Sequence, residues 1–162
     1  MKKLNIALVA HDARKQELAE WCAHNAQWLA NHNLFGTGTT AQLLSKIPII
    51  SNNEGKTSEA GYMRLIVTPL LSGPLGGDSE ISTMIAHGKI DVLIFFCDNL
   101  ITQGHQQDVG ALSRLASLYN IAFATNRTTA DLIVTSPLLV DNSYTRVIPP
   151  VIERYRNRFA VS

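Results

Sequence analysis

The run LNIALVA, residues 4–10, decides the fold class because it is continuously apolar and rich in residues that favour strands. A strand with one solvated face alternates apolar and polar residues, whereas a strand inside a parallel sheet is buried on both faces and is apolar throughout. The run IDVLIFF, residues 90–96, has the same character. Both runs therefore predict strands at the centre of a parallel sheet.

Helical segments alternate with strands along the chain, since apolar side chains between residues 13 and 32 recur with the spacing of one helix face. Further strands are predicted at residues 33–36, 64–70 and 121–126, and further helices at 41–46, 79–89, 108–120, 128–137 and 149–159. This alternation predicts an α/β fold. We expect a single doubly wound domain, Rossmann-like or flavodoxin-like, over residues 1–162, with a five-stranded, mostly parallel sheet and helices on both faces.

Residues 46–63, KIPIISNNEGKTSEAGYM, do not fit this alternation. The segment is polar in the middle and long for a connection inside a compact domain. Two interpretations remain open for it, a β-hairpin insertion and a mobile loop.

Charge and hydropathy exclude several classes of protein. Lys and Arg number 14 against 13 Asp and Glu, and this balance argues against a nucleic-acid-binding protein or a polybasic membrane module. No apolar run approaches the roughly 20 residues that span a bilayer. The start, MKKLNIALVAHD, has two lysines before an apolar run, but the run is short and lacks a small-residue cleavage site. We therefore expect a cytoplasmic protein.

The two cysteines, Cys22 and Cys97, are far apart and form no metal-binding or redox motif. We expect both to be buried and reduced, as is usual in the cytoplasm. Cys97 as a nucleophile is the less favoured alternative, because its neighbours in sequence are apolar and include no base.

Polar side chains follow every predicted strand, at the edge of the sheet where ligands bind in this fold class. Two further polar side chains, His105 and Asp108, lie at or just before the start of the helix predicted at 108–120. The residues that follow the strands are His11, Asp12, Thr37, Thr39, Thr40, Ser72, Asp78, Asp98, Thr125 and Asn126. Taken singly, each aspartate is also a typical helix cap. His105 has a second interpretation as an exposed loop residue, and His11 has one as a half-buried histidine of the core. Gathered at one edge, like charges raise the pKa of at least one carboxylate and produce acid–base pairs.

Two segments at this edge suit a phosphate group. The stretch TGTT, Thr37–Gly38–Thr39–Thr40, offers hydroxyls and backbone N–H groups at a helix start. The stretch SGPLGGD, residues 72–78, offers more N–H groups, unobstructed by side chains, and ends on an acid. Lys15 can add a positive charge. Neither segment matches a nucleotide-binding fingerprint, so the pattern indicates a small phosphate ester beside a carboxylate base.

No metal cage is evident in the sequence. His11, Asp12 and Asp98 are chemically able to ligate a cation, but this is the minor interpretation of the three residues. We expect no bound metal.

The motifs resemble those of the methylglyoxal synthase family. The matching stretches are IALVAHDARKQ, GTGTT, LSGPLGGD, GKIDVLIFFCD, GHQQDV and IAFATNRTTAD, which occur in the family's order and cover most of the chain. The resemblance implies conversion of dihydroxyacetone phosphate to methylglyoxal and inorganic phosphate without a cofactor. It also implies a homohexamer that is inhibited by phosphate.

The resemblance also implies roles for individual residues. Asp78 corresponds to the catalytic base. His11, Lys15, Thr37, Gly38, Thr39, Thr40, Ser72, Gly73 and His105 correspond to substrate-binding positions, His105 also taking part in catalysis. Asp12, Asp98 and Asp108 correspond to acidic residues around the site, with Asp98 and Asp108 counted among the catalytic residues. The family uses a C-terminal arginine that reaches a neighbouring subunit, and Arg158 is preferred over Arg154 and Arg156 for that role.

The chain departs from the family pattern in three places. Ala41 stands where glycine usually follows TGTT, GHQQD replaces a proline-containing stretch around the histidine and aspartate, and residues 46–63 are an insertion. The alternative function is an effector-binding regulatory domain of the carbamoyl phosphate synthetase type, which has a related fold and performs no chemistry.

Overall fold

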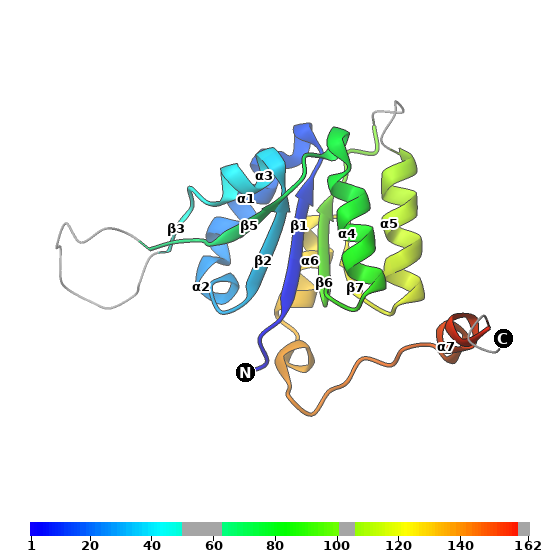
Figure 1. Cartoon of the computed structure of the whole chain (residues 1–162). Coiled ribbons are helices and arrows are strands. Elements are labelled where there is room, and N and C mark those ends of the chain that lie inside the picture. The colour runs from blue at the N-terminus through cyan, green and yellow to red at the C-terminus, as the bar shows by residue number, and fades with distance from the viewer. Residues whose placement is uncertain (50–62, 101–105, 159–162) are drawn as a thin grey trace.

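The computed structural model describes residues 1–49, 63–100 and 106–158. Its centre is a five-stranded sheet in the order β5-β2-β1-β6-β7 with every neighbouring pair parallel (Figure 1). The strands are β1 (Asn5–Ala10), β2 (Asn33–Thr37), β5 (Val67–Leu70), β6 (Val92–Phe96) and β7 (Ala122–Ala124). The predicted α/β class and parallel sheet are confirmed.

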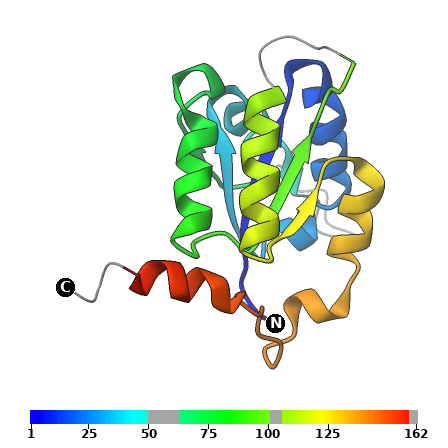
Figure 2. The ribbon, with the colours of Figure 1, turned by 90° about the vertical axis from the view of Figure 1, so that its right-hand side faces the viewer.

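Helices cover both faces of the sheet (Figures 1 and 2). One face packs against α1 (Lys15–His24), α2 (Ala26–Leu29), α3 (Gly38–Leu44) and α6 (Arg127–Val134). The opposite face packs against α4 (Gly77–Ala86) and α5 (Gln106–Leu118). The sheet therefore separates two apolar cores.

The side chains of β1 alternate between these two cores. Ile6 and Leu8 belong to the core beneath α1, whereas Ala7 and Val9 belong to the core beneath α4 and α5. Strand β6 alternates in the same way, and all five of its residues are buried. Burial on both faces explains why these segments are continuously apolar.

The helix predicted over residues 13–32 is broken in the structure. A 3₁₀ turn, η1 (Asp12–Arg14), precedes α1, and Asn25 separates α1 from α2. The Asn25 side-chain amide donates to the carbonyl of Trp21 at 2.9 Å, a local bond that competes with helix continuation. Apolar spacing alone did not reveal this break.

The strand predicted over residues 64–70 is also divided. Val67–Leu70 forms the edge strand β5, which tolerates Pro69 because one of its sides is unpaired in the sheet. Met63–Arg64 forms β4, which pairs antiparallel with β3 (Pro48–Ile49). The described ends of the 46–63 insertion thus pair like the arms of a hairpin, and residues 50–62 lie outside the described residues.

After α6 the chain passes through the 3₁₀ helix η3 (Pro137–Val140) and ends in α7 (Pro150–Asn157), near the amino ends of the strands (Figure 2). Arg156 of α7 donates to the carbonyl of Ala86 at 2.9 Å. Across the described ranges, every helix is too short or too polar to cross a bilayer.

His32 gives the fold a dependence on pH. Its side chain is buried, Nδ1 accepts the backbone N–H of Leu4 at 3.3 Å, and the ring meets Trp28 edge-on. Burial, and secondarily the charge of Lys3, lower the pKa of His32 from 6.5. Because the unfolded chain then binds the proton more readily, the stability that neutral His32 contributes is lost as pH falls below about 6.5.

We expect the free energy of unfolding to decline between pH 7 and pH 5, by at most about 1.4 kcal/mol per pH unit for this single proton. Urea denaturation at several pH values measures the slope. The variant His32→Gln, which retains an acceptor, should have a shallower slope, while His24→Gln, at an exposed position, should match the parent. Equal slopes in the parent and in His32→Gln would contradict the assignment.

Candidate functional site

A cleft of about 1100 Å³ lies beyond the carboxyl ends of β1, β2, β5 and β6. Ten of the residues predicted from the sequence line it: His11, Asp12, Lys15, Thr37, Thr39, Thr40, Ser72, Gly73, Asp78 and Asp98. They come from four separate segments of the chain. The parallel topology brings these segments to one edge of the sheet.

Lys15 joins two of these segments. Its ammonium donates to Oδ1 of Asp12 at 2.5 Å and to Oγ1 of Thr39 at 2.6 Å. The Lys15 side chain is 24% exposed, whereas that of Asp12 is 94% exposed. Lys15 therefore holds a partly shielded positive charge against the start of α3.

His11 is held by the neighbouring strand. The backbone N–H of Asp98 donates to His11 Nδ1 at 2.8 Å, and the ring packs edge-on against Phe95 at 5.0 Å between centroids. With Nδ1 as an acceptor, the neutral imidazole carries its hydrogen on Nε2. The two sequence interpretations of His11 are thus compatible, because the ring packs on the core and also lines the cleft.

The three threonines of TGTT differ in environment. Thr37 and Thr40 are buried, with their hydroxyl oxygens 3.5 Å apart. Thr39 is exposed and bonds to Lys15. Among the three hydroxyls, that of Thr39 has the most open access to the cleft.

The glycine-rich loop after β5 packs directly against the start of α3. A Cβ at Gly38 would lie 2.8 Å from Cβ of Ser72, and a Cβ at Gly77 would overlap the carbonyl oxygen of Leu71. That carbonyl also accepts the N–H of Gly38 at 3.3 Å. Two glycines are therefore required by close backbone approach, independently of any ligand.

Three N–H groups of this loop bond within the loop. Leu75 and Gly77 donate to the carbonyl of Ser72, at 2.9 and 3.1 Å, and Gly76 donates to Gly73 at 2.9 Å, which forms the 3₁₀ turn η2 (Gly73–Leu75). The expectation that this loop offers N–H groups to a ligand stays a prediction for the amides that lack such a bond. In the described part of the chain, the amides of Ser72 and Gly73 have no such acceptor, and both residues line the cleft.

Asp78 is the second residue of α4 and does not cap it. The N-cap is Gly76, with a left-handed φ of 99°, and no side chain caps the helix start. The half-buried Asp78 side chain lines the cleft, and no described residue donates a hydrogen bond to its carboxylate. The glycine-rich loop thus ends on Asp78, whose carboxylate lines the cleft and is available to act as a base.

The other predicted acids have local partners or lie outside the description. Oδ1 of Asp98 accepts the N–H of Leu100 at 3.1 Å, a turn-forming bond, and Asp12 pairs with Lys15. The backbone of Asp108 lies in the first turn of α5, but its side chain is outside the described residues. His105 is outside them entirely. A cluster of four facing carboxylates therefore stays a prediction.

Two polar residues of the cleft were not predicted. Asn99 follows Asp98, and Ser113 lies on α5 one turn after Val109, which also lines the cleft. Helical spacing from the predicted Asp108 points to residues 111 and 112 instead, so it gave no signal for Ser113. Gly38, also predicted, lies between the lining residues Thr37 and Thr39. Arg158 is exposed at the end of α7 and is not among the residues that line the cleft.

The remaining candidates from the sequence are a metal site and the two cysteines. Throughout the described ranges, no three His, Cys, Asp or Glu side chains gather as a metal site would require. Cys22 and Cys97 are buried and free, as predicted. Burial raises the pKa of the Cys97 thiol to about 11, against a smaller opposing effect of Arg14, so the thiolate is scarce at neutral pH.

Comparisons with known proteins identify a family and several relatives of this chain. The model of the MGS-like domain family matches residues 17–125. Methylglyoxal synthase from Maridesulfovibrio salexigens is 50% identical over 136 residues, covering 84% of this chain and 85% of the relative. The enzyme of that name from Proteus mirabilis is 46% identical over 143 residues, covering 88% of this chain and 84% of the relative.

A solved structure agrees with these sequence relatives. The crystal structure of methylglyoxal synthase from Elizabethkingia anophelis superposes with a TM-score of 0.75 at 38% identity. The match covers 91% of this chain and 86% of that one. The resemblance found in the motifs is confirmed.

We expect Gly77→Ala to lower the free energy of unfolding by about 1–3 kcal/mol, because the added methyl must displace the Leu71 carbonyl. The control is Gly73→Ala, where no atom lies within 4 Å of the added Cβ, so stability should stay near that of the parent. Urea denaturation measures both variants. Equal stability of the two would show that the loop contact is less tight than the structure indicates.

Proposed function

We propose that this chain, which belongs to the methylglyoxal synthase family, is a carbon–oxygen lyase that converts dihydroxyacetone phosphate to methylglyoxal and inorganic phosphate. The observation that carries the proposal is the Asp78 carboxylate, without a hydrogen-bond donor among the described residues, in the same cleft as the Lys15–Thr39 pair. The Asp78 carboxylate suits proton removal, and the Lys15–Thr39 pair suits the binding of an anionic phosphate.

The phosphate of the substrate would bind beside Lys15, Thr39 and the amides of Ser72 and Gly73. Lys15 supplies a positive charge that is already oriented by two hydrogen bonds, so little side-chain entropy is lost on binding. Gly73 supports the proposal further, because open space surrounds its Cβ position and lets a ligand approach the backbone.

Asp78 would remove a proton from the hydroxyl-bearing carbon next to the ketone. The electron pair of the broken C–H bond then forms an enediolate, whose negative charge requires nearby hydrogen-bond donors. His11, which lines the cleft, would supply one donor from its Nε2, which is buried in the structure. From the family resemblance we assign the main donor role, and the movement of protons between the oxygens, to His105.

Elimination follows when the carbon–oxygen bond to phosphate on the other carbon breaks and its electron pair leaves with the phosphate. The resulting enol converts to methylglyoxal by proton transfer to carbon. Overlap with the π system requires this bond to lie out of the enediolate plane. Contacts from Thr39 and from the Ser72–Gly73 backbone would impose that rotation and favour elimination over isomerisation.

The regulatory-domain alternative is not favoured by the comparisons. The relatives reported above are named as enzymes, and this chain covers 84–85% of their length. A purely effector-binding domain also has no use for the uncommitted Asp78 carboxylate. Phosphate, the product, would occupy the same cradle as the substrate's phosphate group and would therefore inhibit.

Assembly as a cytoplasmic homohexamer is part of the same proposal. The edge of the sheet at β5 is flanked by the exposed side chains of Ile66, Leu71 and Leu75, which a neighbouring subunit would cover. Arg158 follows α7, at the end of the sheet opposite the cleft (Figure 1). Arg158 would therefore contribute to the cleft of a neighbouring subunit rather than to the cleft of its own chain.

Purified protein supplied with dihydroxyacetone phosphate should release methylglyoxal and phosphate in equal amounts. Asp78→Asn should reduce this release by at least about 10³-fold, within the range of general-base contributions, while stability and phosphate binding persist. Phosphate release and far-UV circular dichroism measure the two properties. Parent protein that binds phosphate without turnover would favour the regulatory alternative, and turnover by Asp78→Asn near the parent rate would exclude Asp78 as the base.

Glu80 should position Asp78. Its Oε2 accepts the N–H of Leu71 at 2.9 Å and so ties the end of β5 to the first turn of α4. We expect Glu80→Ala to lower kcat about tenfold with a smaller change in KM, because the base moves relative to the reacting carbon. Glu80→Gln keeps an acceptor oxygen and should restore kcat. Equal losses in both variants would argue against positioning through this bond.

A further inference from the structure

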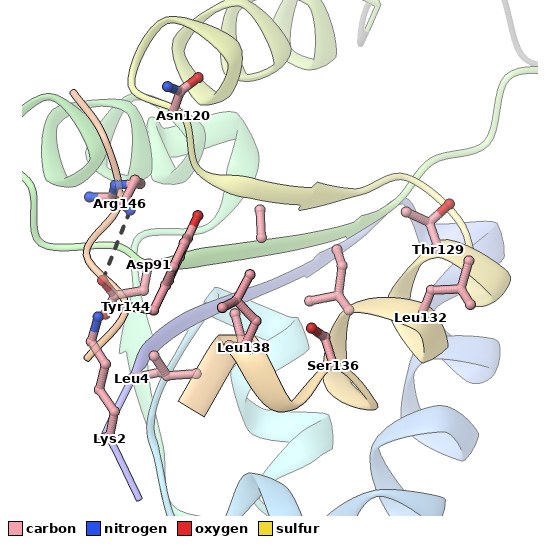
Figure 3. Close-up of a pocket in the computed structure, with 13 residues that line it drawn as sticks. Lys2, Leu4, Asp91, Asn120, Thr129, Leu132, Ser136, Leu138, Tyr144 and Arg146 are labelled. Atoms are coloured by element: carbon pink, nitrogen blue, oxygen red, sulfur yellow. Dashed lines mark ion pairs between the residues drawn. The ribbon is translucent and has the colours of Figure 1, made fainter. Parts of the chain in front are cut away.

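A second pocket, of about 330 Å³, begins beside the amino ends of β1 and β6 and extends along β7 and α6 (Figure 3). Its walls come from the chain before β1 and β6, from β7, α6 and η3, and from the segment that leads to α7. The two cavities have no lining residue in common. The proposed lyase reaction does not use this pocket.

One end of the pocket carries the charged groups, Lys2, Asp91 and Arg146 (Figure 3). Asp91 accepts the N–H of Asn5 through Oδ2 at 2.9 Å, and its Oδ1 lies 3.9 Å from Arg146 Nη1. Two cations against one carboxylate leave a formal excess of one positive charge. That excess favours an anion with a single charge.

The Arg146 guanidinium has further capacity to donate. Nη1 donates to the carbonyl of Ile90 at 3.1 Å, which fixes the side chain across the amino end of β6. Its Nε is buried, and the described residues offer it no acceptor. A buried N–H without an acceptor is unfavourable, so a ligand oxygen within reach would be stabilising.

The other end of the pocket is lined by leucines together with the hydroxyl-bearing side chains of Thr129 and Ser136 (Figure 3). Leu132 lies there, away from Lys2 and Arg146 (Figure 3), and Leu138 is part of the wall. Their side chains are 68% and 50% exposed, although both line a concave surface. A ligand with an aliphatic portion would remove this apolar area from water.

We propose that this pocket is a second binding site, for a small monoanionic carboxylate with an aliphatic tail. The carboxylate pairs with Lys2 and Arg146, and the tail lies along Leu132 and Leu138. The volume is at the lower limit of ligand pockets, which suits a short chain. A phosphate ester, with two negative charges and no tail, fits the cleft better than this pocket.

Hexanoate is the test ligand, and 1-hexanol is its uncharged control. In a ¹H–¹⁵N NMR titration, hexanoate should shift the Arg146 Nε–H and the backbone amides of Ala122 and Leu132 in a saturable way. The amides of Thr39 and Gly73, in the cleft, should not move. Equal binding of hexanol, or shifts confined to Thr39 and Gly73, would overturn the proposal.

Charge variants test the recognition of the carboxylate. Lys2→Glu should raise the hexanoate Kd about tenfold, because it replaces an attractive charge with a repulsive one. Lys3→Glu makes the same change one residue away, outside the pocket lining, and should leave Kd unchanged. Excess inorganic phosphate should not displace hexanoate. An equal rise in Kd for Lys2→Glu and Lys3→Glu, or displacement by phosphate, would exclude this site.

Discussion

The loop after β5 and the first turn of α3 approach so closely that neither Gly38 nor Gly77 has room for a methyl group. The carbonyl of Leu71 lies at the centre of this contact, accepting the N–H of Gly38 while its oxygen abuts Gly77. Because α4 begins at Gly77, the same contact fixes where Asp78 stands relative to the threonines of α3. The geometry of the cleft depends on this contact between two backbones.

A rigid base is useful in the proposed reaction because the intermediate has two fates. An enediolate can be reprotonated, or it can lose phosphate if the carbon–oxygen bond is rotated out of plane. The outcome depends on how the phosphate is held relative to the base, and close positioning of reacting groups has large effects on rate. Lys15, bonded to both Asp12 and Thr39, fixes the charge on the phosphate side. The bare loop thus has a structural function and, at Ser72 and Gly73, a proposed binding function.

The two ends of the sheet present different chemistry. At the carboxyl ends, hydroxyls, an ammonium and a carboxylate line a large cleft, as suits a polar phosphate ester. At the amino ends, a smaller pocket combines an excess positive charge with leucine side chains. Strands β1 and β6 begin beside the pocket and end beside the cleft. The proposed ligands differ accordingly in charge and in apolar surface.

The sequence by itself determined the α/β class, both central strands and the residues that follow the strand ends, because burial on two faces and parallel topology constrain local composition directly. It did not determine the break at Asn25, the division of residues 64–70, or the internal bonding of the glycine loop. These three features depend on the hydrogen-bond partner of each amide and carbonyl group. Only the tertiary structure determines those partners. For the same reason, the sequence left open whether Asp78 caps a helix. The structure decided that question by placing Gly76, with a left-handed φ, at the cap, which leaves Asp78 in the first turn of the helix and lining the cleft.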